Sequence, residues 1–239
     1  MHIIPYGENA LLLNFDQQIS PEINQQVQSW EDRIRAAQIP GLSHFIPAYA
    51  SLTVVFEQVL QNPEATIAYI QQLVDQPIIE ERQQHRSLRI PVCYEADFAP
   101  DQNTVMEQLG LDWPEIIRLH TQASFRVYML GFSPGFAFMG RLPEALHIPR
   151  KQNPRLKVPA RSVGLAGEQT GIYPNQIPGG WQLIGQTPLP PFLPAEKEVF
   201  LFQPGDSVQF YAINKGAYAD IRNEIESGNF DWNSLQQAR

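Results

Sequence analysis

The sequence of 239 residues is long enough for one large domain or two ordinary ones, and its 43% hydrophobic content can supply a core. Its 18% charged residues exclude an intrinsically disordered chain, and its net charge of -8 argues against general nucleic-acid binding. A single cysteine excludes an internal disulfide bond, and no hydrophobic run approaches the roughly 18 residues that a membrane span needs.

The N-terminal segment has no basic residues before its hydrophobic run and no small-residue cleavage site, so we expect no signal peptide. The low cysteine content fits a reducing compartment. We therefore expect a soluble, cytoplasmic protein that binds neither membranes nor nucleic acids.

Residues 1–95 show strand and helix patterns in turn. Hydrophobic residues alternate from Leu11 to Phe15, which predicts a strand, and Ser20 with Pro21 predicts the start of a helix. The further predicted elements are strands over residues 44–49 and 52–57, a helix after Asn62 and Pro63, and a strand over residues 88–92. This β-α-β-β-α-β order is that of a ferredoxin-like α/β domain.

Residues 96–124 predict a helical bridge. Asp101 is placed to cap a helix that ends before Gly110, and Asp112 to cap a second helix with Pro114 in its first turn. Residues 125–213 are rich in glycine and proline between short strand-like pieces, which is typical of a small β-barrel or sandwich. Its last strands are expected over 199–203 and 207–213, and residues 214–239 predict an appended helix or a frayed tail.

A basic segment, residues 126–187, lies within this β-rich region. It carries seven cationic residues: Arg126, Arg141, Arg150, Lys151, Arg155, Lys157 and Arg161. Only Glu144 and Glu168 oppose them, so the segment is positively charged in an acidic chain. Either these residues face an anion or an acidic partner, or they pair with acidic residues elsewhere in the chain.

Several familiar catalytic devices are absent from the sequence. Residues 131–135 satisfy the G-x-S-x-G pattern around Ser133, but Pro134 lacks the backbone N–H that a nucleophile elbow uses for its oxyanion. The five histidines lack metal-ligand spacing and are expected on the surface or as helix caps, and Cys93 is expected to be a buried small residue. No lysine follows a glycine, so there is no phosphate-binding loop of the G-x-x-x-x-G-K-[ST] type.

Three motifs carry a resemblance to a known family: GFSPGFAFMG at 131–140, PRLKVPARSVGLAG at 154–167 and QTGIYPNQIPGGWQLIGQTPL at 169–189. They resemble the family of the 5-oxoprolinase B subunit, also called allophanate hydrolase subunit 1, which includes the Kip inhibitor of a histidine kinase. The resemblance implies two domains, of which the one carrying these motifs is a cyclophilin-like β-barrel. Together with the pattern of residues 1–95, it predicts an α+β protein with a ferredoxin-like N-terminal domain and a C-terminal cyclophilin-like β-barrel.

The resemblance also implies a function. The chain would be a subunit of an ATP-dependent 5-oxoprolinase, which opens 5-oxo-L-proline to L-glutamate. It would act beside a second barrel-bearing subunit, of the C type or allophanate hydrolase subunit 2 type, and beside an A-type subunit. ATP would then be used by the complex, without a phosphate-binding loop or a metal site in this chain. The alternatives are inhibition of a sensor histidine kinase and a part in allophanate or urea metabolism.

Polar and glycine residues of the basic segment form a candidate site for an anion or a carbonyl group. The candidates are Arg150, Arg155, Ser162, Gln169, Thr170, Tyr173, Gly179 and Gly180. Arginine can hold a carboxylate or a phosphate, and the two glycines would let the backbone approach a ligand. The alternative is that these residues only brace the loops of the barrel. Arg161 departs from the family resemblance, which has glycine at this position.

Overall fold

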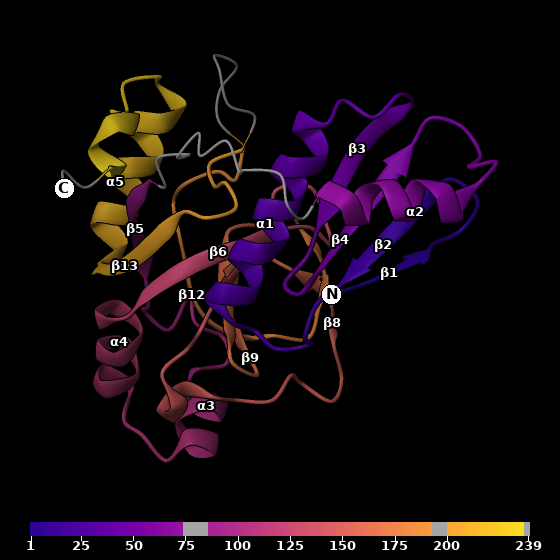
Figure 1. The fold of residues 1–239 in the computed structure, drawn as a ribbon. Helices are drawn as coiled ribbons and strands as arrows, with labels where there is room; N and C mark the ends of the chain where they lie inside the picture. The colour runs from indigo at the N-terminus through magenta and orange to yellow at the C-terminus, as the bar shows by residue number, and fades with distance from the viewer. Residues whose placement is uncertain (74–85, 193–199, 237–239) are drawn as a thin grey trace. The chain divides into compact units, whose positions relative to one another are not determined.

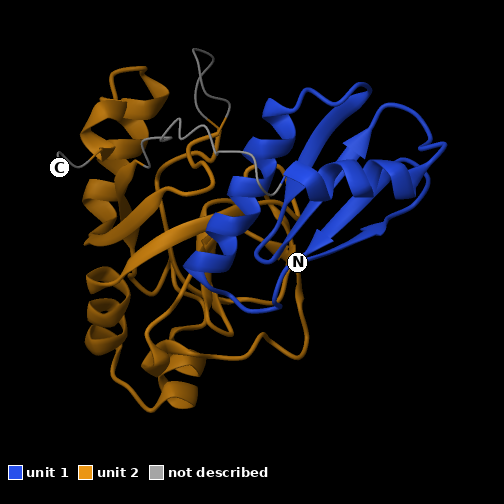
Figure 2. Cartoon of the chain, viewed as in Figure 1, with its two compact units in different colours: residues 1–84 blue, residues 85–239 orange. Residues whose placement is uncertain are grey.

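The computed structural model describes residues 1–73, 86–192 and 200–236. The chain divides into two compact units, residues 1–84 and 85–239 (Figures 1 and 2). No described helix combines the length and the apolar character that crossing a membrane requires.

Unit 1 contains a four-stranded antiparallel sheet and two helices. The strands are β1 (His2–Pro5), β2 (Ala10–Asn14), β3 (Leu42–Pro47) and β4 (Ser51–Phe56), and the helices are α1 (Pro21–Ala36) and α2 (Pro63–Gln72). The strand order is β1-β2-β4-β3. Leu11, Leu13 and Val27 are among the residues of its buried hydrophobic core.

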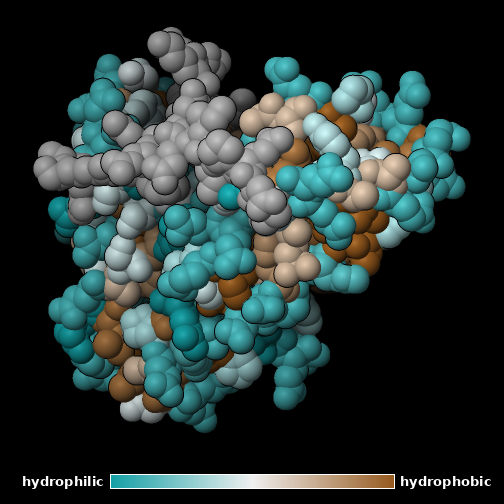
Figure 3. All heavy atoms as spheres, viewed as in Figure 1, coloured by the Kyte–Doolittle hydropathy of each residue, from teal (hydrophilic) through white to brown (hydrophobic). Residues whose placement is uncertain are grey.

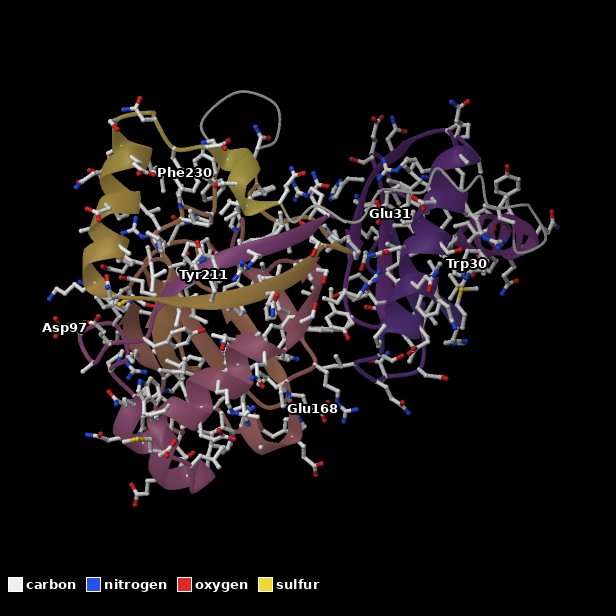
Figure 4. All side chains as sticks on the ribbon, turned by 90° about the vertical axis from the view of Figure 1, so that its left-hand side faces the viewer. Trp30, Glu31, Asp97, Glu168, Tyr211 and Phe230 are labelled. Carbon is white, nitrogen blue, oxygen red and sulfur yellow. The ribbon has the colours of Figure 1, made fainter. Side chains whose placement is uncertain are left out.

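Both helices of unit 1 begin where the sequence predicts. The Ser20 side chain accepts hydrogen bonds from the backbone at the start of α1, and Asn62 accepts one from Ala65 N at 3.0 Å. These side chains satisfy N–H groups that have no partner within the helix. Trp30, which is buried, and its neighbour Glu31 lie on α1 (Figure 4).

The predicted β-α-β-β-α-β order is wrong in its last element. The strand expected over residues 88–92 is part of β5 (Ser87–Cys93), which belongs to the barrel of unit 2, and β1 takes the edge position in the sheet of unit 1. Consecutive residues from Ile90 to Cys93 are all buried in β5. Such a strand needs cover on both faces, which a barrel packed against helices provides. A ferredoxin-like unit therefore does not describe residues 1–95.

Unit 2 contains a closed barrel of seven strands in the order β10-β7-β6-β13-β5-β12-β9. Besides β5, these are β6 (Ser124–Leu130), β7 (Ala137–Gly140), β9 (Ser162–Ala166), β10 (Gln169–Ile172), β12 (Gln182–Gln186) and β13 (Ser207–Ile213). Neighbouring strands are antiparallel except β5 and β13, which run parallel. Of the strand expected over residues 199–203, residue 199 lies outside the described residues, and Phe200 forms only an isolated bridge with Phe192.

Helices pack against the barrel. They are α3 (Gln102–Leu109), α4 (Trp113–Gln122), α5 (Lys215–Glu226) and two short 3-10 helices, η2 (Glu144–Leu146) and η3 (Trp232–Leu235). Val105, Ile116 and Leu235 join the hydrophobic core that the barrel strands build. Gly110 ends α3 with a φ of 65°, as the sequence predicts, and residues after 214 form α5 and η3.

A two-stranded ribbon, β8 (Arg155–Val158) and β11 (Ile177–Gly179), lies apart from the barrel sheet. A second core of aromatic and aliphatic residues is associated with it: Phe136, Val158, Ala166, Tyr173, Trp181 and Leu183. Gly171 makes this packing possible, because a Cβ there would meet the Ala137 carbonyl at 2.7 Å and the Trp181 ring at 3.1 Å. On the face of unit 2 drawn in Figure 3, most of the coloured residues are hydrophilic, and hydrophobic residues are scattered among them.

Candidate functional site

Asp101 is the centre of a buried charged group. Its side chain, 3% exposed, accepts hydrogen bonds at Oδ1 from Lys151 Nζ (2.9 Å) and Arg155 Nη2 (2.5 Å). Its Oδ2 accepts one from the backbone N–H of Leu183 at 2.7 Å. Asp101 therefore joins the start of α3, the loop before the ribbon, strand β8 of the ribbon and strand β12 of the barrel.

Asp101 lies at the helix start that the sequence predicts, but the prediction that its side chain caps this helix is wrong. Asp101 stands directly before α3, yet its carboxylate makes no capping hydrogen bond to that helix. Burial alone would raise the pKa of Asp101, but hydrogen bonds from Arg155, the Leu183 N–H and Lys151 outweigh burial and lower the pKa. The carboxylate therefore stays charged. The only signal in the sequence was the basic segment itself, which had to face either an anion or acidic residues elsewhere.

The ribbon brings four of the eight candidate residues together. Arg155 lies opposite Gly179 across the ribbon, and the Gly180 carbonyl accepts a hydrogen bond from Lys151 N at 2.7 Å. The hydroxyl of Tyr173 occupies the space that a Cβ on Gly179 would need. Only glycine at position 179 lets this hydroxyl lie against the backbone.

The Tyr173 side chain is buried and lies near cationic groups. Burial raises its pKa, while a hydrogen bond with the backbone of Trp181 and the charges of Arg150 and Arg155 act in the opposite direction. Arg150, a fifth candidate, is exposed, and it makes no ion pair with any described residue. The arrangement therefore places two cationic groups near a buried, neutral hydroxyl, and arginine side chains suit an anionic ligand.

Three candidates lie elsewhere in the barrel wall. Ser162 is buried on β9, where its carbonyl accepts a hydrogen bond from Tyr173 N at 2.9 Å. Gln169 begins β10, and its Oε1 is buried without a partner among the described atoms. Thr170 is fully buried, and its hydroxyl donates to the Gly164 carbonyl at 3.1 Å. We therefore place Ser162 and Thr170 in the framework of the barrel, because their side chains are shielded from solvent.

Thr170 is part of a buried chain of hydrogen bonds through His120. His120 on α4 lies with Nδ1 2.7 Å from Tyr94 Oη and Nε2 3.0 Å from Thr170 Oγ1. Burial lowers the pKa of His120 to about 3, so the ring is neutral. The expectation that every histidine lies at the surface or caps a helix is wrong for His120, because its two nitrogens find partners inside the protein. Cys93 is buried as predicted, and burial raises its pKa.

Arg161 has an unusual backbone conformation. Its φ is 68°, in the left-handed region that favours glycine. Its N–H donates to the Tyr173 carbonyl at 2.6 Å, and its own carbonyl accepts from Thr187 N at 3.0 Å. These two bonds hold the residue in place from both sides. Its Nε is buried and finds no partner among the residues described.

The charges of the basic segment are only partly neutralised within the chain. Arg141 pairs with Glu168 at 2.6 Å, and Asp101 holds two further cations. Arg150 and Lys157 are both exposed, and neither forms an ion pair with a residue that the structure describes. Internal pairing is therefore shown for Arg141, Lys151 and Arg155, whereas a role of Arg150 or Lys157 toward an anion or a partner stays a prediction.

The loop with the G-x-S-x-G pattern is not a nucleophile elbow. Residues 131–135 connect the antiparallel strands β6 and β7, and no helix follows. Phe132 in this loop has a φ of 65° and is 73% exposed. It borders an open hollow of about 350 Å³ lined also by Leu130, Pro134 and Phe200. Among the described residues, no group of three or more His, Cys, Asp or Glu could hold a metal ion.

Comparisons with known proteins identify relatives along most of the chain. The family model "Carboxyltransferase domain, subdomain C and D" matches residues 1–202. The protein named as the B subunit of 5-oxoprolinase in Bacillus subtilis (strain 168) is 37% identical over 228 residues, which cover 91% of this chain and 95% of that protein.

Solved structures show the same fold inside longer chains. The crystal structure of TTHA0988 matches 86% of this chain with a TM-score of 0.74 and 33% identity, and this chain spans 40% of its length. The Kluyveromyces lactis urea carboxylase matches 96% of this chain with a TM-score of 0.77, at 18% identity over 23% of its length. The first two matches, to the family model and to the Bacillus protein, decide the assignment: the chain belongs to the family of the 5-oxoprolinase B subunit, built on carboxyltransferase subdomains C and D.

Proposed function

We propose that this chain is a subunit of an ATP-dependent 5-oxoprolinase, which opens 5-oxo-L-proline to L-glutamate in complex with partner subunits. The similarity to a protein named as the B subunit of 5-oxoprolinase, along 95% of that protein's length, carries the proposal. The cations near Tyr173 support it, because the substrate is an anion and arginine binds carboxylates well.

The chemistry of the reaction asks for little nucleophilic machinery in this chain. A lactam is unreactive, and phosphorylation of its carbonyl oxygen by ATP would make it labile to water. The protein's task is then to position the substrate and to stabilise developing negative charge. Arg150 and Arg155 are the residues to which we assign that task here, and Ser162 contributes by fixing the backbone of Tyr173.

Partner subunits follow from the length of the relatives. The region equivalent to this chain spans only 40% of TTHA0988, whereas the Bacillus relative is covered almost completely. We propose that what the longer chain carries covalently is supplied here by separate proteins, a C-type subunit with a second barrel and an A-type subunit. ATP binding belongs to the assembled complex. A stable interface of this kind buries about 1,200 Å² or more.

The proposal is tested by assaying purified components. The chain alone should release no glutamate from 5-oxoproline with ATP, and complexes captured from native lysate through a tag on this chain should do so. Release of glutamate by the chain alone, after removal of contaminating subunits, would show that no shared site is needed. Captured complexes that consume neither 5-oxoproline nor ATP would refute the assigned reaction.

A charge reversal tests the site within the same assay. Arg150→Glu changes an exposed residue and breaks no buried ion pair, so the fold should persist while activity of the complex falls. Lys157→Glu is the matched control, since Lys157 is an exposed cation of the same segment that is not among the groups acting on Tyr173. Equal activity of the two variants would remove Arg150 from the site.

A further inference from the structure

Asp101 gathers two cationic side chains on a single carboxylate oxygen. Lys151 Nζ lies 2.9 Å from Oδ1, and Arg155 Nη2 lies 2.5 Å from the same oxygen. The distance between the two nitrogens is therefore at most the sum of these two distances. Each cationic side chain is 24% exposed, whereas Asp101 is 3% exposed. The two positive charges are therefore close together and largely withdrawn from water, but both side chains remain partly exposed.

The Asp101 group, meaning Asp101, Lys151 and Arg155, has one negative charge for two positive ones. No second carboxylate among the described residues pairs with either cation. Like charges held together away from water repel each other, and a nearby anion relieves that repulsion. The imbalance therefore points to a missing anionic group.

The Asp101 group also contains hydrogen-bond donors for which the described residues provide no acceptor. Arg155 Nη1 is buried and has no partner among the described atoms. The Lys151 ammonium has three N–H groups and gives one to Asp101. A buried donor without a partner is unfavourable, and proteins retain one where a ligand, an ion or a water molecule satisfies it.

We infer that the Asp101 group binds the carboxylate of the substrate, with Lys151 and Arg155 as its contacts and Asp101 as their positioning residue. The inference rests on the proposed function, in which 5-oxoproline is the substrate and the carboxylate is its one charged group. Lys151 and Asp101 thereby join the site, although neither was among the eight candidate residues.

Asp101 is suited to positioning because it is hydrogen-bonded to strand β12 of the barrel. Its Oδ2 binds the backbone N–H of Leu183 on β12, and its own N–H lies 3.3 Å from the Leu183 carbonyl. Two bonds to one residue of the barrel hold the carboxylate in one orientation. The orientation of both cations follows from this attachment.

The test compares two lactams that differ only in the carboxylate, 5-oxoproline and 2-pyrrolidinone. Their Kd values are measured by calorimetry with the assembled complex and with the chain alone, in the absence of ATP. Wild type should bind 5-oxoproline at least about tenfold more tightly, the preference expected from hydrogen bonds to a charged group. Asp101→Asn removes the charged anchor of both cations, which can then move apart. The loss of their common orientation should reduce this preference toward one and leave the Kd of 2-pyrrolidinone unchanged.

Asp97→Asn provides the matched control. Asp97 is a carboxylate four positions earlier that pairs with Lys215 at 2.5 Å, is 68% exposed, and lies beside the start of α5 (Figure 4). This variant should bind both lactams as wild type does. If thermal unfolding shows that Asp101→Asn does not fold, Lys151→Met takes its place, because it keeps the pair of Asp101 and Arg155 and should show the same loss of preference.

The outcomes separate this inference from the proposed function. Wild type that binds the two lactams equally well, or binds neither, overturns the inference. A folded Asp101→Asn or Lys151→Met variant with an unchanged preference overturns it too. Binding with the expected preference in a complex that releases no glutamate would remove the proposed function and support the carboxylate site.

Discussion

His120 Nε2 lies 3.0 Å from the hydroxyl oxygen of Thr170, which itself donates to the Gly164 carbonyl. Because the Thr170 proton is used in that second bond, His120 must carry its proton on Nε2, and Nδ1 must accept from Tyr94. The neutral imidazole thus connects α4 with β10 of the barrel wall. A charged imidazole would require Tyr94 Oη to accept a hydrogen bond from Nδ1 instead of donating one.

The first prediction concerns pH. The pKa of His120 is lowered to about 3 in the folded state against 6.5 in the unfolded state. Above pH 6.5 neither state binds the proton, and as the pH falls below 6.5 only the unfolded state takes it up. The free energy of unfolding should therefore fall by about 2 kcal/mol between pH 7 and pH 5 because of this residue.

Urea unfolding of wild type and His120→Gln at pH 7 and pH 5 measures the effect. The variant should be less stable at pH 7 but should lose less stability on acidification. Asp101 does not interfere in this range, because its lowered pKa affects stability only as the pH falls through the unfolded value of 3.8 and below. An equal decrease in the free energy of unfolding from pH 7 to pH 5 in both proteins would show that His120 is not the residue that titrates.

The second prediction compares neighbouring glycines. A Cβ on residue 179 would overlap the hydroxyl and ring of Tyr173, whereas a Cβ on residue 180 would find its nearest atom at 3.6 Å. Gly179→Ala should cost about 1–3 kcal/mol and move Tyr173, and Gly180→Ala should change stability by less than about 0.5 kcal/mol. Thermal unfolding compares the stabilities of the two variants. Equal stability would mean that the Tyr173 side chain can move away from residue 179 without loss of stability.

The third prediction concerns Arg161, whose φ of 68° is strained for any residue except glycine. Arg161→Gly should stabilise the protein by about 1 kcal/mol, since relief of strain exceeds the added freedom of the unfolded chain. Arg161→Ala keeps the strain and should show no gain in melting temperature. A less stable glycine variant would reveal a favourable role of the guanidinium.

The fourth prediction concerns Ser133, which lies in a turn between β6 and β7 where Pro134 offers no N–H to an oxyanion. Ser133→Ala should leave the rate of the assembled complex within about twofold of wild type, since no step is assigned to the hydroxyl. Glutamate release under saturating ATP measures it. Complete loss of activity in a folded variant would reinstate the serine as a nucleophile.

Local patterns in the sequence predict much of this fold. Ser20, Asn62 and Gly110 mark helix ends because capping depends on a few neighbouring residues. The partner of the strand at residues 88–92 could not be read in this way. It pairs with β13, more than a hundred residues later, and the alternation of hydrophobic residues in a strand does not say which strand it will join.

For the candidate site too, the sequence indicated some of the residues and missed those whose partners lie far away in the chain. The composition of the basic segment indicated either an anion site or internal ion pairs, and the ribbon brings the candidates Arg155, Gly179 and Tyr173 together. Asp101 and His120 were not recognised because both act on residues about fifty positions away. An aspartate before a helix looks like a cap and an isolated histidine looks like a surface residue until the tertiary structure supplies their partners.

An obligatory subunit of a 5-oxoprolinase, as proposed for this chain, must be required for the activity of its complex. The most direct test titrates the purified chain into fixed amounts of the candidate partner subunits and measures ATP-dependent glutamate release from 5-oxoproline. We predict no release without the chain, a linear rise as it is added, and saturation at a fixed stoichiometric ratio. Full activity of the partner subunits without this chain, or no activity at any ratio, would contradict the account.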